Sequence, residues 1–519
     1  MLLTNTLLVG DTLRQHAQKY PNKDAIIFKD QRITYKQYNE RVNRLSNGLF
    51  GLGLKKGDRL GILLMNCSEY MEAYFAANKT GLVGVPINYN LKSDEIKYIL
   101  NHSEAAGLIV GPEFLERLGA VSSELNSLKH CVFVGKDTPS KMIPYEQLLA
   151  SSSPEEPQVD LKEADPNMIM YTSGTTGFPK GAMRSHRANT LLYMYSCIEF
   201  GFTEEDITIS CGPLYHAGPG FFNHMHIYIG GTVLIKDKFE ARDALKTIQD
   251  EKVTTGFIVP TMYNLMMQLP EEELKSYDVS SMRVVISAAA PLHTKTKDWI
   301  LNYFTNAKLS EAYGATELGI CTNLKHRDQR RKIRCVGQGV FGYEMKLLDE
   351  DGNPVKPGDP GILYATGPCM LDGYYKNAKA TEENSAGSWF TVGDIVKEDD
   401  EGYYYVVDRK SDMVISGGVN IYPVEIDNCI MSHPKVADVA VIGIPDELWG
   451  ESLKAFVVIK GGEACTEEEI VEHCRQNLAP YKKPKSVEFV PELPRNPSGK
   501  ILKRVLRDQF WKGQESGVS

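Results

Sequence analysis

NMIMYTSGTTGFPKG, residues 167–181, joins a short and mostly apolar run to a loop of hydroxyls, glycines and one lysine. An apolar run bounded by a turn signal is typical of a buried strand. Glycines let the backbone approach an anion closely, and N–H groups and hydroxyls can donate to phosphate oxygens. The spacing is not that of the common phosphate loop, because Lys180 stands between Pro179 and Gly181. This stretch predicts a strand and then a phosphate-binding loop; a flexible surface turn is the alternative.

The segments around this loop alternate between short apolar runs and helix-like stretches. RLGILLMN (59–66) comes before EYMEAYFAANKTG (69–81), and GGTVLIKD (230–237) comes before ARDALKTIQDEK (241–252). Alternation of this kind predicts βαβ units and largely parallel sheets. The continuous apolar run VVISAAA (284–290) is typical of a strand in a sheet that is covered on both faces. The sequence therefore predicts an α/β fold.

The composition of the chain changes near residue 350. DEDGNPVKPGDPG (349–361) is rich in turn residues, and after DRKSD (408–412) comes a separate mixture of strand-like and helix-like segments. We therefore place a boundary near Arg409 and predict one domain over residues 1–409 and a small α+β domain over residues 410–519. At 519 residues the chain is too long for a single hydrophobic core, which agrees with this division.

Composition and charge exclude several classes of protein. The 58 Lys and Arg against 67 Asp and Glu leave a net charge of −9, which argues against a broad nucleic-acid surface. The ten cysteines are scattered without a C-x-x-C pair, so we expect neither a zinc ribbon nor a disulfide framework. The N-terminus lacks the basic start of a signal peptide, and no apolar run reaches the roughly 18 residues of a spanning helix. We expect a cytoplasmic protein without a nucleic-acid partner or a transmembrane segment; peripheral membrane contact stays open.

Six further motifs follow the loop along the chain. They are PLYHAGP (213–219), ISAAAPL (286–292), EAYGATE (311–317), TVGD (391–394), VVDRKSDMVISGGVNIYPVEID (406–427) and PRNPSGKILKR (494–504). Each motif is weak by itself, but their order is specific. Together with the loop they resemble the signature motifs of the adenylate-forming superfamily, which comprises acyl- and aryl-CoA synthetases, peptide-synthetase adenylation domains and luciferases. Within that superfamily the chain most resembles bacterial fatty-acyl-CoA ligases.

The resemblance implies a fold and a two-step reaction. The fold is a large N-terminal domain of sheets wrapped by helices, with a small distorted β-barrel part, and a small mobile C-terminal domain. In the first step a carboxylate attacks the α-phosphate of ATP, which gives an acyl-adenylate and pyrophosphate. In the second step the thiol of coenzyme A displaces AMP. ATP, Mg²⁺ and coenzyme A are the implied cofactors and co-substrates.

The resemblance assigns the loop to the β- and γ-phosphates of ATP. The implied phosphate-binding residues are Thr172, Ser173, Gly174, Thr175, Thr176, Gly177 and Lys180. Thr316 and Glu317 resemble the pair that meets the α-phosphate and Mg²⁺, and Thr172 would join Glu317 at the metal. Negative charge approaches negative charge in this step, so cations and oriented donors are required, and hard oxygen ligands suit Mg²⁺. A carboxylate that stabilises a helix N-terminus is the alternative for Glu317.

The same resemblance assigns the nucleoside part of ATP. Asp394 would accept both ribose hydroxyls, because a carboxylate can take two such bonds, and Arg409 would contact the ribose or a phosphate. The implied walls of the adenine site are Ala289, Ala290, Pro291, Glu311, Ala312, Tyr313 and Gly314. The superfamily often has glycine in the first of these segments, so the alanines predict a slightly narrower pocket.

Lys500, in NPSGK, is the residue that the resemblance assigns to adenylate formation. A lysine on this turn can bridge the attacking carboxylate and the α-phosphate and neutralise both. An ordinary surface lysine is the alternative. Thr316, Glu317 and His216 complete the implied catalytic set, and His216 resembles the residue that gates the acyl and pantetheine tunnels.

The segment ISGGVNIYP resembles the loop that lines the pantetheine tunnel in the second step. Gly417 and Gly418 would let the backbone approach the thiol arm, and Trp449 would shape the coenzyme A entrance or only pack the small domain. The hinge position of the superfamily falls on Ser411, where aspartate or lysine is usual. Asp412 is the neighbouring charged alternative.

Two features bear on the acid that is activated. Amino-acid-activating relatives carry an aspartate shortly after the PLYH-like motif, and AGPGFFNHM (217–225) contains no acidic residue, which argues against an amino acid. The resemblance to fatty-acyl-CoA ligases favours a medium- or long-chain fatty acid, and an aryl acid such as benzoate or cinnamate is the alternative. The candidate acyl-pocket residues are Phe221, Phe222, Tyr263 and Ser287, for which core packing is the other interpretation.

Other functions are compatible with part of the motif set. A non-catalytic nucleotide- or acyl-binding module would not need Lys500, Glu317 and Asp394 together, so their joint presence argues against it. A luciferase-like oxygenase needs the same adenylation step and stays open. The predicted partners are a small carboxylic acid, ATP and coenzyme A, and a homodimer is left open.

Overall fold

The structure is a computed structural model that describes residues 8–172, 179–416, 419–446, 448–495 and 500–511, without the side chains of Ser411 and Asn420. Contacts divide the chain into two units. The first unit comprises Met1–Arg331, Gly339–Glu344 and Thr366–Ser388, and the second comprises Lys332–Gln338, Met345–Ala365 and Trp389–Ser519. The boundary assigned from the sequence at residues 409 and 410 stays a prediction.

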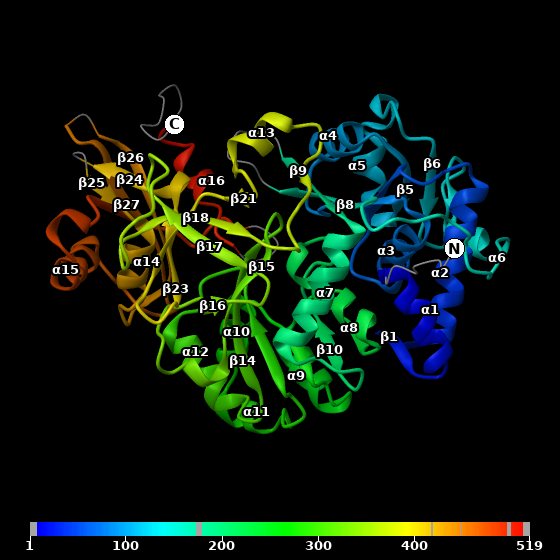
Figure 1. Cartoon of the computed structure of the whole chain (residues 1–519). Helices are drawn as coiled ribbons and strands as arrows, with labels where there is room; N and C mark the ends of the chain where they lie inside the picture. The colour runs from blue at the N-terminus through cyan, green and yellow to red at the C-terminus, as the bar shows by residue number, and fades with distance from the viewer. Residues whose placement is uncertain (1–7, 173–178, 417–418, 447, 496–499, 512–519) are drawn as a thin grey trace. The chain divides into compact units, whose positions relative to one another are not determined.

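The expected phosphate loop follows a strand of an eight-stranded sheet in the first unit (Figure 1). The strand order is β19-β9-β8-β4-β3-β5-β6-β7. The strands are β3 (Arg59–Leu63), β4 (Val83–Pro86), β5 (Ala105–Val110), β6 (His130–Phe133), β7 (Ile143–Pro144), β8 (Pro166–Thr172), β9 (Lys180–Ser185) and β19 (Gly373–Tyr374). β3 to β8 pair in parallel, whereas β8 and β9 form an antiparallel pair on either side of the loop.

A second sheet of the first unit carries three of the expected motifs at the ends of its strands. Its order is β15-β14-β13-β12-β10-β11-β1-β2, and the pairs from β14 to β1 are parallel, as the alternation of strands and helices predicts. The strands are β1 (Asp24–Phe28), β2 (Gln31–Thr34), β10 (Ile207–Ser210), β11 (Thr232–Ile235), β12 (Thr255–Phe257), β13 (Val284–Ser287), β14 (Lys308–Ala315) and β15 (Gly319–Leu324), followed by β16 (Gln338–Gly339).

Helices cover both faces of the second sheet (Figure 1). Residues of α9, α10, α11 and α12 form one hydrophobic core with it, and residues of α7 and α8 contribute to a separate core on the other face. The helices of the unit are α1 (Val9–Lys19), α2 (Tyr35–Gly51), α3 (Ser68–Thr80), α4 (Ser93–Ser103), α5 (Leu115–Gly119), α6 (Tyr145–Ala150), α7 (His186–Phe200), α8 (Ala217–Ile229), α9 (Ala241–Asp250), α10 (Pro260–Met267), α11 (Glu271–Lys275), α12 (Thr294–Tyr303) and α13 (Ala378–Glu383), with β20 (Ser385–Ala386) after the last. The α/β class is therefore confirmed.

Local sequence sets the two ends of α8. His216 is the N-cap residue, and its Nδ1 accepts a hydrogen bond from the N–H of Gly218 at 3.4 Å. The helix ends at Gly230, whose φ of +91° is a left-handed conformation that glycine adopts without strain. Because β10 ends at Ser210, α8 begins near the carboxyl edge of the parallel strands, which is where open α/β sheets bind ligands.

The second unit contains two smaller sheets. β17 (Glu344–Leu348), β18 (Gly361–Thr366), β21 (Trp389–Phe390), β22 (Asp394–Glu398) and β23 (Tyr404–Arg409) form one sheet. This is the part expected to be a small distorted barrel; among the described residues its strand order is an open path. The other sheet contains β24 (Val414–Ser416), β25 (Val419–Ile421), β26 (Val436–Asp446), β27 (Gly450–Ile459) and β28 (Ser486–Phe489), and the unit's helices are α14 (Pro423–Met431), α15 (Glu467–Asn477) and α16 (Lys503–Arg507).

Two further properties apply to the chain as a whole. Across the part of the chain that the structure describes, no helix combines the length and the apolar character needed to cross a membrane. The ten cysteines carry free thiols.

Candidate active site

Thr172 and Lys180 stand at the two ends of the expected phosphate loop. They are partners across the antiparallel pair β8 and β9, so the loop leaves and re-enters the sheet at one place. The loop residues Ser173, Gly174, Thr175, Thr176 and Gly177 lie outside the described residues. The structure thus locates the base of the loop, and the roles of its interior residues stay predictions.

A carboxylate from a distant part of the chain meets the end of β8. The Oγ1 of Thr172 donates to the Oε1 of Glu317 at 3.1 Å, and the hydroxyl of Tyr374 donates to the same oxygen at 3.0 Å. Glu317 is 8% exposed and lies with Thr316 in a turn between β14 and β15, not at a helix N-terminus. The Nζ of Lys180 lies 5.2 Å from the centroid of the Tyr374 ring. Thr172, Lys180, Glu317 and Tyr374 therefore form one cluster at the base of the loop.

Tyr374 belongs to this cluster although the sequence interpretation gave it no role. β19 pairs with β9 through Tyr374 and Ala182, which brings the phenol to the end of the loop. Burial and the negative charge of Glu317 raise the pKa of Tyr374, so the phenol keeps its proton and donates a hydrogen bond to the carboxylate. The local sequence signal, two tyrosines after Gly373, indicates a short strand but not its partner.

Arg184 holds the turn that carries Thr316 and Glu317, and it too was missed. The residue is fully buried. Its guanidinium donates to the carbonyl oxygens of Thr316 at 3.0 Å and Cys369 at 2.6 Å. It also donates to the side-chain oxygen of Asn189 at 2.7 Å. A buried cation without partners is strongly destabilising, so Arg184 is expected to keep these three hydrogen bonds. The bonds hold the turn that carries Thr316 and Glu317 in a fixed position relative to β9.

The first segment of the expected adenine site contains backbone strain. Ala289 has a φ of +69°, in the left-handed region that favours glycine. A residue with a side chain loses roughly 1–2 kcal/mol in this conformation. Ala289, Ala290 and Pro291 follow β13 and are exposed or half-buried, as a ligand wall requires. Strain of this kind gathers at ligand-binding segments, and it gives a physical reason for the glycine that the superfamily often has here.

The second segment, Glu311–Gly314, lies on β14. A Cβ atom on Gly314 would stand 1.9 Å from the carbonyl oxygen of Gly319, so only glycine fits at this position. Glu311 forms a buried ion pair with Lys297 of α12, and burial raises the pKa of Glu311 to about 7. The side chain of Glu311 is therefore held in an ion pair on the α12 side of the sheet. This leaves Ala312, Tyr313 and the backbone for contact with a ligand.

The structure does not bring the four acyl-pocket candidates together. Phe221 and Phe222 belong to the core shared with α7 and α8, whereas Tyr263 belongs to the core on the opposite face of the second sheet. Ser287 is a partner of Glu311 across β13 and β14, and strand alternation puts both side chains on the face of α12. All four residues are buried. Only Phe221 and Phe222 share a face with α8 and with its N-cap residue.

Three charged groups of the second unit lie close together. The Nε of Arg409 lies 3.1 Å from the Oδ1 of Asp394, and the two residues are partners across β22 and β23. Burial and the positive charge of Arg409 lower the pKa of Lys500 to about 8, and the negative charges of Asp394 and Asp412 act in the opposite direction. Asp394 of TVGD and Lys500 of NPSGK therefore lie close enough to influence each other within this unit.

The remaining candidates are only partly described. Ser411 lies in the short 3-10 helix η4 (Lys410–Asp412), and Gly417 and Gly418 lie outside the described residues. Trp449 is 54% exposed, and its backbone N–H donates to the carboxylate of Asp446 at 3.1 Å. The assignments of the hinge and the coenzyme A tunnel stay predictions.

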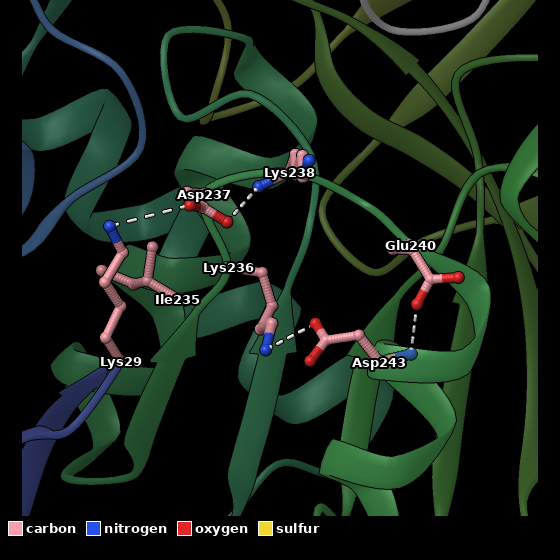
Figure 2. A pocket seen from close by; sticks show the side chains of 7 residues that line it. All are labelled: Lys29, Ile235, Lys236, Asp237, Lys238, Glu240 and Asp243. Atoms are coloured by element: carbon pink, nitrogen blue, oxygen red, sulfur yellow. Dashed lines mark hydrogen bonds and ion pairs between the residues drawn. The ribbon is translucent and has the colours of Figure 1, made fainter.

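A cavity of about 310 Å³ is lined by none of these residues (Figure 2). Four of its charged groups are paired: Lys236 with Asp243 at 2.6 Å and Lys29 with Asp237 at 3.7 Å. The lining residues are Lys29, Ile235, Lys236, Asp237, Lys238, Glu240 and Asp243. None of them is a candidate from the sequence, and we assign the cavity no role.

The arrangement in the first unit is that of a nucleotide-binding α/β enzyme, with its polar cluster at the end of a strand. Residues 13–375 match the AMP-binding enzyme family, and residues 425–500 match the C-terminal domain of AMP-binding enzymes. The chain therefore belongs to the AMP-binding enzyme family, which confirms the superfamily that the motifs indicate.

Relatives of known activity are similar over nearly the whole chain. A feruloyl-CoA synthase of Amycolatopsis sp is 35% identical over 96% of this chain and 98% of its own length. A long-chain-fatty-acid–CoA ligase of Mycobacterium tuberculosis is 34% identical over 97% of this chain and 98% of its own length. The crystal structure of the anthranilate CoA ligase AuaEII in complex with anthranoyl-AMP has a TM-score of 0.90 and 29% identity and covers 97% of both chains. The protein is an AMP-forming acid–CoA ligase that uses ATP and coenzyme A.

Proposed function

We propose that the cluster at the base of the loop holds the triphosphate of ATP. The contact between Thr172 and Glu317 at 3.1 Å carries this proposal, because it joins the loop to the expected catalytic turn. Lys180 adds a positive charge, and the loop residues between them would donate hydrogen bonds. The hydroxyl and the carboxylate are hard oxygen donors, so they fit Mg²⁺, which when bound would reduce the negative charge of the phosphates.

The charged group of the second unit would act on the other half of ATP. Asp394 would accept the ribose hydroxyls, Arg409 would contact the ribose or a phosphate, and Lys500 would lie between the acid and the α-phosphate. A carboxylate oxygen of the acid attacks the α-phosphorus, and pyrophosphate leaves with the bridging oxygen. The sulfur of coenzyme A then attacks the acyl carbon, AMP leaves, and the thiol proton passes to solvent.

The low pKa of Lys500 leads to a pH prediction. Only the ammonium form neutralises the two anions, and the pKa of about 8 means that this form is lost as the pH rises through 8. We expect kcat/KM for ATP in pyrophosphate release to fall about tenfold per pH unit above pH 8. Lys500→Arg keeps its charge and should move the fall to higher pH. A rate that stays constant up to pH 10 in the wild type would contradict the role of Lys500.

Aromatic rings on α8 and on its neighbours bear on the size of the acid. The ring centroid of Phe222 lies 4.7 Å from that of Phe257 on β12 and 5.6 Å from that of Phe200 on α7. A Cβ atom on Gly218 would lie 2.7 Å from the Phe257 ring. Phe222 is six residues beyond His216, which is about 9 Å along a helix. We therefore propose a medium-chain or aryl acid, since a longer chain starting at His216 would have to displace these rings.

Long-chain fatty acids are the second candidate. The long-chain ligase of Mycobacterium tuberculosis and the feruloyl-CoA synthase are almost equally similar to this chain, so similarity favours neither class. A panel of C4 to C18 fatty acids, benzoate, anthranilate and cinnamates, scored by pyrophosphate release with and without coenzyme A, separates them. We expect the highest kcat/KM among C6 to C10 or aryl acids.

Phe222→Val tests the aromatic rings directly. Removing the ring should raise kcat/KM for C14 to C18 acids relative to C6 to C8 acids by at least about tenfold. Phe133→Val is the matched control, because Phe133 is equally buried but lies in the other sheet. An unchanged chain-length profile in Phe222→Val, or a wild type that prefers C16 acids, would contradict the proposed pocket.

The remaining site assignments made from the sequence are part of this proposal. Ala289, Ala290, Pro291 and the Glu311–Gly314 segment would contact adenine, and His216 would gate the acyl site. Ser411 would be the hinge, and Gly417, Gly418 and Trp449 would line the path of coenzyme A. We also keep a cytoplasmic location and a homodimer as predictions, the second of which light scattering tests.

A further inference from the structure

Asp408 is a buried carboxylate that the reaction described above does not use. It is 3% exposed and lies at the end of β23, directly before Arg409. Its Oδ2 accepts the backbone N–H of Val424 at 3.0 Å, and its Oδ1 accepts that of Arg409 at 2.8 Å. Val424 is in the first turn of α14, so the carboxylate satisfies one of the free N–H groups at the helix N-terminus and faces the positive end of its dipole.

Lys503 approaches the same helix as Asp408, because it pairs with Asp427, which follows Val424 by three residues in α14 and so lies on the same face of the helix. The Nζ of Lys503 lies 2.6 Å from the Oδ2 of Asp427, and these two side chains are 14% and 16% exposed. Asp427 also accepts the N–H of Val441 at 2.6 Å. Burial raises the pKa of Asp408 to about 6, and among the opposing influences the positive charge of Lys503 is the largest. The positive charge of Lys503 therefore acts on both Asp427 and Asp408.

The position of Lys503 determines where Lys500 stands. Two residues separate them in GKILK, and the chain between them is held by a bridge from Ile501 to Arg495 and by the bond from the N–H of Leu502 to the carbonyl of Pro494 at 2.7 Å. α16 continues from Lys503, and its Leu506 is buried in a core with residues of β26 and β27. Residues 500–503 therefore have little freedom once Lys503 is bound.

Asp408 and its partners lie on opposite sides of the proposed hinge in the chain. Asp408 precedes Ser411, whereas Val424, Asp427 and Lys503 follow it. Rotation at Ser411 would keep Lys503 with Asp427 and would separate both from Asp408. Buried opposite charges gain little net free energy from each other, because desolvation offsets most of the attraction, so the attraction between Lys503 and Asp408 can be gained and lost.

We propose that Asp408 and Lys503 are positioning residues that cross the hinge and hold Lys500 beside Asp394 and Arg409 for adenylate formation. The pair separates when the hinge turns for the thioester step. This inference rests on the proposed function, because it needs the two half-reactions and the hinge. Asp408 and Lys503 touch neither substrate nor the reacting atoms; they act through Lys500.

Asp408→Asn tests the proposal with little change of shape. Asparagine still accepts the N–H of Val424 but has no charge for Lys503. We expect pyrophosphate release from acid and ATP to fall at least about tenfold, while thioester formation from added acyl-adenylate and coenzyme A stays unchanged or becomes faster. Lys503→Met should shift the ratio of the two half-reactions in the same direction, and Lys503→Arg should restore most of the wild-type ratio.

Asp206→Asn is the matched control for loss of a buried carboxylate. Asp206 is 1% exposed, accepts the N–H of Thr203 at 2.8 Å and pairs with Arg283 in the first unit. Its removal should lower both half-reactions by the same factor. Equal loss of both half-reactions in Asp408→Asn, or no loss in either, would overturn the proposal. If Asp408→Asn does not fold, Lys503→Met decides the question by the same ratio.

The test also separates this inference from the function on which it rests. A wild type that releases no pyrophosphate with any acid of the panel contradicts the proposed function itself. A wild type that completes both half-reactions while the variants keep the wild-type ratio contradicts only the positioning role. The wild type therefore tests the proposed function, and the variants test the positioning role, in the same experiment.

Discussion

Lys500→Ala is expected to lower the rate of pyrophosphate release by about 10²–10³-fold, the range found when one electrostatic donor to a transition state is removed. Lys500 lies beside Arg409 and Asp394 in the second unit, and its charge would neutralise the attacking carboxylate and the α-phosphate. The thioester step involves a different pair of reacting atoms. Formation of the thioester from added acyl-adenylate and coenzyme A should therefore stay within about threefold of the wild type.

Lys503→Ala is not a suitable control for this experiment, because Lys503 is proposed to position Lys500. Lys454, which pairs with Glu488 at 3.2 Å across β27 and β28 of the same unit, is the better choice. Lys454→Ala should leave both half-reactions near their wild-type rates. Equal losses of both half-reactions in Lys500→Ala would contradict a role confined to adenylation.

Glu317→Gln is expected to lower pyrophosphate release by a similar factor of about 10²–10³. The glutamine oxygen can still accept bonds from the hydroxyls of Thr172 and Tyr374, which now stand 3.1 Å and 3.0 Å from the Oε1 of Glu317. The negative charge is lost, and with it the attraction for a divalent cation. The Mg²⁺ concentration that gives half-maximal rate should therefore rise together with the loss of kcat.

Tyr374→Phe separates the charge of Glu317 from its hydrogen bonds. This variant removes one donor to Glu317 and leaves the carboxylate in place, so we expect a loss of about tenfold or less and a small change in the Mg²⁺ requirement. Titrations of pyrophosphate release with MgCl₂ at fixed ATP measure both effects. A Glu317→Gln enzyme with the Mg²⁺ dependence of the wild type would rule out the proposed metal role.

Local features of the fold follow closely from the sequence. The apolar run before the loop forms β8 over Pro166–Thr172, and the helix expected from residue 241 is α9 over Ala241–Asp250. Parallel pairing in both sheets of the first unit also agrees with the alternation of strands and helices. These features are predictable because apolar periodicity and turn residues act within a few residues of one another.

Partners between distant segments could not be predicted in the same way. Of the four acyl-pocket candidates, Tyr263 and Ser287 lie on one side of the second sheet, and Phe221 and Phe222 lie on the other. Ser287 is on β13, where a side chain changes face with every residue, whereas the other three are on helices that cover one face of the sheet or the other. Which face meets which helix is therefore set by the packing of the whole unit.

The sequence by itself determined the α/β class, the order of the motifs and the membership of the adenylate-forming enzymes, because each motif needs only its own few residues to be recognised. Only the tertiary structure joined Tyr374 to Glu317, which are 57 residues apart, and placed Asp408 at the N-terminus of α14, the helix whose Asp427 pairs with Lys503. The physical reason is that a buried polar group must find a partner after folding. That partner depends on strand pairing and helix docking rather than on neighbouring residues in the chain.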